Sequence, residues 1–239
     1  MNNDKKEYIE FIESAIHDLD APLRKLSFFS DKLSQKLENL SEDGAQEYLS
    51  RMQSCVSDMR MIIEGLSVLS RISAESAEMI PCDLENIAKE AWNDLQQFAE
   101  EKKATIHFTS LPVIEGDPDQ LEQLFKNLFE NSVKFAKTGV PLTIDVQSGI
   151  ANAEEKERLG LEGSYYKIQV SDNGIGFRQE YAEKIFKPFV RLHGKSEFPG
   201  NGLGLAICKK IIDNHRGIIY ADWIENSGAC FVLILPKKS

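Results

Sequence analysis

The segment DPDQLEQLFKNLFENSVKFAK, residues 117–137, combines a capped amphipathic helix with a row of polar side chains. Asp117 is a residue type that caps helices, and Pro118 follows at the first helical position, where proline is tolerated. An apolar stripe recurs at helical spacing: Leu121, Leu124 and Leu128. We therefore expect a helix from residue 118 to about residue 137, packed on a core through this stripe.

Outward from this helix, the chain mixes helical and strand patterns. Further helices are expected at residues 86–102 and 203–214. Strands are expected at residues 105–109, 142–146, 166–170, 218–220 and 231–235. The polar stretch 147–164 is expected to be a surface loop of a long hairpin. Helices and antiparallel strands in this order predict an α+β fold, with an α/β sandwich in residues 80–239.

Residues 4–73 have a different pattern, which is helical almost throughout. Apolar residues alternate steps of three and four from Ile9 to Leu26, the row continues to Leu40, and a second row runs from Leu49 to Leu69. Residues 41–44, Ser-Glu-Asp-Gly, predict the turn between them. Residues 1–75 are thus expected to form an antiparallel helical hairpin, and two copies would bury their stripes as a four-helix bundle in a homodimer. The segment 74–81 is the expected domain boundary.

Composition excludes several kinds of protein. The 239-residue chain has a formal net charge of −10, which repels nucleic acid phosphates, so we expect no nucleic acid partner. No run approaches the ~18 apolar residues of a membrane span, and no membrane contact is expected within this chain. The four cysteines form no CxxC pair, which favours a reducing, cytoplasmic location over a zinc site or a disulfide framework.

His17 is followed directly by Asp18. A neutral imidazole is a nucleophile, and a neighbouring carboxylate can orient it and accept its proton. Considered alone, His17 is equally compatible with an ordinary surface histidine.

Asn127, Asn131 and Lys134 share one face of the helix that begins at residue 118. Two carboxamides and an ammonium group in this arrangement suit a Mg²⁺-phosphate group, as oxygen ligand, water-ordering group and charge clamp. Without other motifs, the same row would describe a solvated polar face.

Two glycine-containing motifs follow. Asp172-Asn173-Gly174-Ile175-Gly176 comes after a strand, where a carboxylate can accept a hydrogen bond from an exocyclic amine and glycines allow close approach; it is also a strong turn signal. Gly200-Asn201-Gly202-Leu203-Gly204-Leu205 leads into a helix, whose first N–H groups can bind phosphate. The second motif follows no strand and precedes no Lys-Ser/Thr pair, which excludes the Rossmann and Walker patterns.

In its motif order the chain resembles the histidine kinase family of two-component signalling, whose ATP-binding half is shared with gyrase-type relatives. The matching motifs are HDLDAPL from His17, NLFENSVKFAK from Asn127, DNGIGF from Asp172, FKPF from Phe186, GNGLGLA from Gly200 and the final strand around Gly228. The stretch around His17, with Pro22-Leu23-Arg24, is most similar to the phytochrome-like branch.

The resemblance implies a function and a role for each motif residue. His17 would be the phosphoacceptor oriented by Asp18, Asn131 the Mg²⁺ ligand, Asn127 a water-ordering residue and Asp172 the adenine contact. The other residues expected to bind ATP are Lys134, Gly174, Gly176, Lys187, Arg191, Gly200, Gly202, Leu203 and Gly204. The expected activity is ATP-dependent autophosphorylation, followed by transfer to an aspartate of a response-regulator receiver domain.

Two other functions share parts of this pattern. A gyrase-type ATPase switch would need no phosphoacceptor, but such relatives place a glutamate four residues before the metal-binding asparagine, where this chain has Asn127. An inactive dimerisation module would not bind Mg·ATP.

Ala21 stands where bifunctional kinases have Thr or Asn, so weak phosphatase activity toward a phosphorylated partner is expected.

Overall fold

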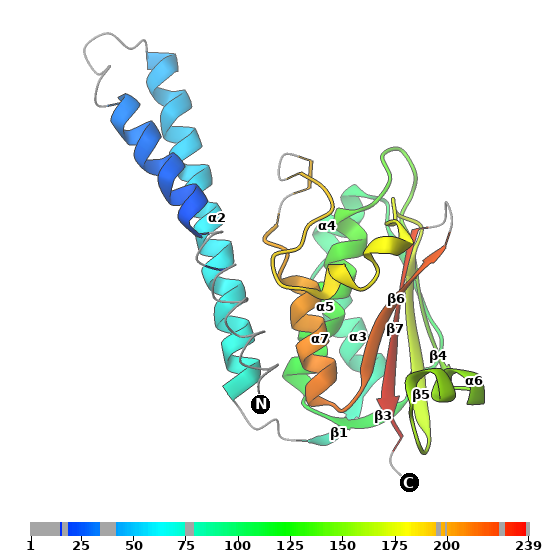
Figure 1. Cartoon of the computed structure of the whole chain (residues 1–239). Helices are drawn as coiled ribbons and strands as arrows, with labels where there is room; N and C mark the ends of the chain where they lie inside the picture. The colour runs from blue at the N-terminus through cyan, green and yellow to red at the C-terminus, as the bar shows by residue number, and fades with distance from the viewer. Residues whose placement is uncertain are drawn as a thin grey trace. The chain divides into compact units, whose positions relative to one another are not determined.

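The computed structural model describes residues 15, 19–33, 42–74, 79–194, 197–198, 200–224 and 228–237 (Figure 1). The chain divides into two compact units, Met1–Val68 with Pro188–Leu203, and Leu69–Lys187 with Gly204–Ser239. His17 and Asp18 lie outside the described residues, as do residues 34–41 between the two expected helices of the hairpin.

The second unit is built on a five-stranded sheet in the order β2-β4-β5-β7-β6. Its strands are β2 (Thr105–Phe108), β4 (Thr143–Ile150), β5 (Tyr165–Asp172), β6 (Ile218–Ile224) and β7 (Gly228–Pro236). Each overlaps a segment predicted as a strand, so the α+β class is confirmed. One expectation is wrong: β2 pairs parallel with β4, since the chain crosses over through α5 between them, while the remaining pairs are antiparallel.

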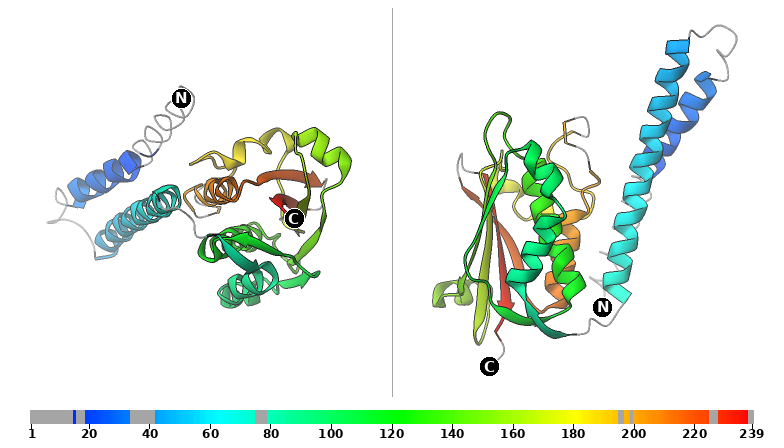
Figure 2. Two further views of the ribbon diagram at one scale, coloured as in Figure 1. Left: turned by 90° about the horizontal axis from the view of Figure 1, so that it is seen from below. Right: turned by 180° about the vertical axis from the view of Figure 1, so that it is seen from behind.

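Helices lie on both faces of this sheet (Figures 1 and 2). One face carries α3 (Leu84–Asn93), α5 (Pro118–Lys134) and α7 (Gly204–Asn214). Residues of β7 are buried along almost its whole length. Because successive strand residues point to opposite faces, this burial requires cover on both sides of the sheet.

The cover on the other face comes from α6 (Ala153–Leu159), which follows β4. The expectation of a surface loop at 147–164 is therefore wrong. Asn152 and Glu155 form a capping box that starts α6 in a charged segment without apolar periodicity. Leu159 then packs against a buried cluster that includes Val232 and Ile234.

The helix expected at residues 118–137 is confirmed as α5, which ends at Lys134. The Asp117 side chain accepts a hydrogen bond from the Gln120 N–H (3.1 Å), as its residue type predicted. The helix expected at 203–214 is likewise confirmed as α7.

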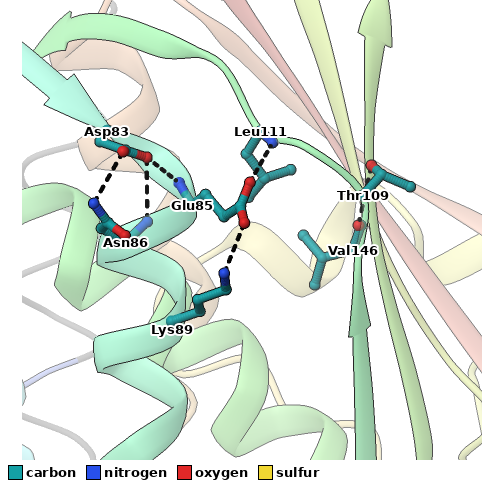
Figure 3. Close-up of polar contacts among 7 residues, drawn as sticks. All are labelled: Asp83, Glu85, Asn86, Lys89, Thr109, Leu111 and Val146. Atoms are coloured by element: carbon teal, nitrogen blue, oxygen red, sulfur yellow. Dashed lines mark hydrogen bonds and ion pairs between the residues drawn. The ribbon is translucent and has the colours of Figure 1, made fainter.

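The single helix expected at residues 86–102 is instead two, α3 and α4 (Gln96–Glu101). The break falls at Asp94-Leu95, directly after Asn93; Asn and Asp favour turns because they hydrogen-bond nearby backbone. Figure 3 shows how α3 begins: Asp83 accepts hydrogen bonds from the Glu85 and Asn86 N–H groups (3.0 and 3.2 Å). Glu85 pairs with Lys89 (2.7 Å) and accepts the Leu111 N–H (3.3 Å), which ties α3 to the segment after β2.

A two-stranded antiparallel sheet was not predicted from the sequence. It consists of β1 (Ile80–Asp83) and β3 (Val113–Gly116). The two strands lie about 30 residues apart in the sequence, and each is stabilised as a strand by pairing with the other.

In the first unit, residues 19–33 are helical. The helix α2 spans Glu42–Ala74, and its residues up to Val68 belong to the first unit. The Phe29 ring lies 6.1 Å from the Tyr48 ring and beneath the Arg51 guanidinium, so the two helical segments are in contact. The helix α2 begins inside the predicted turn, because acidic residues such as Glu42 and Asp43 are favoured at a helix N-terminus. Within the described parts of the chain, no helix has the length and apolar character needed to cross a bilayer.

Candidate functional site

Asp172 ends β5, and its buried carboxylate is held by three donors. Oδ1 accepts the Gly174 N–H (2.8 Å) and the Ala229 N–H (3.3 Å). The Ser132 hydroxyl lies 3.1 Å from Oδ2 and shares its proton with the Leu128 carbonyl (3.3 Å). Burial raises the pKa of Asp172, while these hydrogen bonds and Lys137 oppose the rise. The result is a carboxylate with one fixed orientation.

Glycines near Asp172 are required by the protein's own backbone. A Cβ on Gly174 would lie 2.6 Å from the Phe135 carbonyl oxygen, and one on Gly228 would lie 1.9 Å from the Asp172 carbonyl oxygen. Gly176, at φ +67°, approaches the Gly228 carbonyl in the same way. Room for a ligand was the reason expected from the sequence; close packing around Asp172 is a further reason that only the structure provides.

The polar residues of α5 differ in what they contact. Asn131 is partly exposed, and none of the described residues hydrogen-bonds to its side chain. Lys134 lies over the Phe135 ring, 4.8 Å from its centroid. Asn127 is buried, accepts from Gln123 (3.0 Å) and donates to the Gly204 carbonyl (3.3 Å). Asn131 is therefore the carboxamide open to a metal or a phosphate.

Ser132 is a site residue that the sequence reasoning missed. It follows Asn131 directly, so α5 offers an open carboxamide at one position and fixes the Asp172 carboxylate from the next. The sequence shows the Ser132 hydroxyl beside Asn131. It does not show that this hydroxyl pairs with Asp172, because the two residues lie 40 positions apart.

Four of the expected ATP-binding residues lie in the first unit: Arg191, Gly200, Gly202 and Leu203. These residues belong to the segment Pro188–Leu203. The Phe189 N–H donates to the Gly202 carbonyl (3.0 Å), so the two ends of this segment are hydrogen-bonded to each other. Gly202 has φ +73°, and a Cβ there would lie 2.9 Å from the Val190 carbonyl oxygen. Leu203 is fully buried, and its N–H donates to the Asn201 side chain (3.0 Å).

The two terminal nitrogens of the Arg191 guanidinium differ in their hydrogen bonding. One guanidinium nitrogen, Nη2, donates to the Phe198 carbonyl (2.7 Å). The other, Nη1, is buried and has no hydrogen-bond partner among the described residues. Buried guanidinium nitrogens are normally satisfied, so this atom fits an anionic ligand. In the second unit, Lys187 is exposed after the 3₁₀ turn Lys184–Phe186, and Gly204 begins α7.

Comparison with known proteins identifies the fold that carries these residues. Residues 116–239 match the family described as histidine kinase-, DNA gyrase B- and HSP90-like ATPases. The chain belongs to this family. The phytochrome-like protein Cph1 of Synechocystis sp. is 30% identical over 227 residues, which are 95% of this chain and 29% of Cph1. The resemblance expected from the motifs is confirmed: within the family, the chain falls with the histidine kinase catalytic cores of the phytochrome-like branch.

Solved structures agree on the fold. The histidine kinase ThkA, in complex with the response regulator TrrA, superposes with a TM-score of 0.67 at 19% identity, over 96% of this chain and 61% of that one. Full-length ShkA in complex with AMPPNP gives 0.60 at 19% identity, over 95% of this chain and 46% of that one. The chain spans 28% to 30% of the length of the phytochrome-type relatives that it matches.

Proposed function

We propose that the chain is the catalytic core of a two-component histidine kinase, which binds Mg·ATP and phosphorylates itself on His17. The observation that carries this proposal is the pairing of Asn131 and Ser132 on α5. Asn131 presents a carboxamide to which none of the described residues hydrogen-bonds, and Ser132 fixes the buried carboxylate of Asp172. Such a carboxylate can accept a hydrogen bond from the adenine amino group, and the carboxamide can ligate the metal of the triphosphate.

The residues present fit Mg²⁺ and the triphosphate. Asn131 would hold the metal through its carboxamide oxygen, since Mg²⁺ takes oxygen ligands and needs few from the protein when phosphates supply others. Bound Mg²⁺ would supply positive charge next to the β- and γ-phosphates. Arg191, whose Nη1 has no hydrogen-bond partner among the described residues, is the first candidate for a phosphate contact, and Lys134 and Lys187 are further candidates. The other residues proposed to contact ATP are Gly174, Gly176 and Gly204 of the second unit and Gly200, Gly202 and Leu203 of the first unit.

The proposed reaction is an in-line phosphoryl transfer. A ring nitrogen of His17 forms a bond to the γ-phosphorus while the bond from that phosphorus to the ADP oxygen breaks, and Asp18 accepts the imidazole proton. The protein contributes position and charge neutralisation more than covalent chemistry. A response-regulator aspartate would then take the phosphoryl group. The complex of ThkA with a regulator supports a partner of this kind.

We also propose that residues 1–75 form the hairpin and dimerise, while residues 80–239 bind ATP. Support comes from α2, where Leu49, Val56 and Ile63 recur every seven residues and are 42%, 45% and 57% exposed. An exposed heptad row on a helix is typical of a coiled-coil seam, and a second copy would bury it. The unpaired cysteines are compatible with the cytoplasm.

The test is incubation of the chain with γ-labelled ATP. We expect label that is stable in base and lost in acid, as a phosphohistidine requires, and its absence from His17→Gln. Asp172→Asn should lose both label and nucleotide binding. Full labelling of His17→Gln would contradict the assignment, and steady ATP turnover without label would favour the ATPase switch. A wild-type chain that does not bind Mg·ATP would instead be the inactive dimerisation module.

A further inference from the structure

Asn127 and Asn131 lie one helical turn apart on α5, yet only Asn131 is open. Resting on the proposed function, we propose that Asn127 is a positioning residue: it fixes the first turn of α7 and does not order water around the metal. Its side chain is only 7% exposed. Both ends of its carboxamide are engaged, Oδ1 by the Gln123 side chain (3.0 Å) and Nδ2 by the Gly204 carbonyl (3.3 Å).

Packing around this bond leaves little freedom. A Cβ built on Gly204 would meet Asn127 atoms at 3.9 to 4.0 Å, which is ordinary contact, so the helix start lies directly on the carboxamide. One turn further along α7, the fully buried Cys208 thiol donates to the Leu124 carbonyl (3.8 Å) and also interacts with Asn127. At this end of their interface, the two helices are thus joined by neighbouring polar contacts.

The location of the Asn127–Gly204 bond gives it a functional consequence. Gly204 is the first residue of α7, and the free N–H groups of a helix start are the donors available to a phosphate. Holding the Gly204 carbonyl fixes the direction in which those N–H groups point. To reach a metal, Asn127 would have to break a buried hydrogen bond, at a cost of about 1 kcal/mol or more.

The experiment compares ADP affinity with Mg²⁺ and with EDTA, together with amide hydrogen exchange of the nucleotide-free chain. For Asn127→Ala we expect ADP to bind about 10-fold more weakly in both conditions, and the Leu205–Cys208 amides to exchange faster. Asn131→Ala, at the proposed metal ligand, should lose affinity only when Mg²⁺ is present. The matched control is Asn214→Ala: Asn214 holds the other end of α7 through the Ile72 carbonyl (2.9 Å) and Gln120 (3.1 Å). The Asn214→Ala variant should bind ADP with an affinity within about 2-fold of the wild-type value.

A loss confined to the Mg²⁺ condition, with normal α7 exchange, would assign Asn127 to the metal and overturn the proposal. Should Asn127→Ala not fold, Asn127→Ser and Gln123→Ala serve in its place, and both should show the same metal-independent loss to a smaller degree. If the wild-type chain does not bind ADP, the proposed function fails. The exchange of the α7 amides in the nucleotide-free chain still decides the role of Asn127.

Discussion

At the residue scale, Gly228 shows how a glycine can be required by a neighbouring backbone. It lies at φ +100°, and its Cβ position would be 1.9 Å from the Asp172 carbonyl oxygen. The same strand start supplies the Ala229 N–H that holds the Asp172 side chain. Any side chain at position 228 must therefore move the residue proposed to contact adenine.

We expect Gly228→Ala to destabilise the fold and abolish ADP binding. The control is Gly163→Ala, at nearly the same φ of +98° but with nothing within 4 Å of its Cβ position. In the control, the free energy of unfolding should fall only by the cost of placing a side chain in a left-handed conformation, about 1–2 kcal/mol, and ADP should bind normally. Urea unfolding should show at least twice that loss for Gly228→Ala. Equal losses in the two variants would mean that the close approach to Asp172 is unimportant.

At the element scale, His215 connects the end of α7 to the start of α5. Its Nδ1–H donates to the Ile211 carbonyl (2.7 Å), and its Nε2 accepts the Asp117 N–H (3.0 Å). This arrangement needs the neutral ring, because a protonated Nε2 could not accept. Burial lowers the pKa of His215, while the Ile211 carbonyl and the Asp117 carboxylate oppose the change.

A pH-dependent stability follows from this link. The folded chain binds a proton at His215 less readily than the unfolded chain does. The stability that the neutral His215 ring contributes is therefore complete above the ordinary histidine pKa of about 6.5 and is lost as pH falls below it. Each unit of lowering corresponds to about 1.4 kcal/mol. Urea unfolding between pH 8 and pH 5 should give a stability difference between wild type and His215→Gln that shrinks as pH falls. A stability difference between wild type and His215→Gln that stays constant from pH 8 to pH 5 would contradict the link.

At the scale of the whole molecule, the exposed heptad row on α2 predicts a dimer. Val56→Glu places a charge in that row and should raise the dimer dissociation constant at least 10-fold, or by about 1.4 kcal/mol. Ser54→Glu adds the same charge two residues away, on the opposite side of the helix, and should leave the dimer intact. Sedimentation equilibrium measures both. Equal dimerisation of the two variants would place the interface elsewhere.

The sequence by itself determined the features whose cause is local. The Asp117 cap, the stripe of α5, the alternation of the main strands and the order of the motifs depend on residues a few positions apart, and these predictions are confirmed. The interaction of the Asp172 motif with Ser132 was not among them.

Only the tertiary structure decided which distant groups meet. Ser132 hydrogen-bonds to a carboxylate 40 residues away, and Asn127 hydrogen-bonds to a carbonyl 77 residues away. The parallel pairing of β2 with β4, the strands β1 and β3, and the docking of α6 on the sheet have the same origin. A hydrogen bond between distant segments leaves no periodic trace in either one, because each donor or acceptor is satisfied only after both segments have packed on a common core.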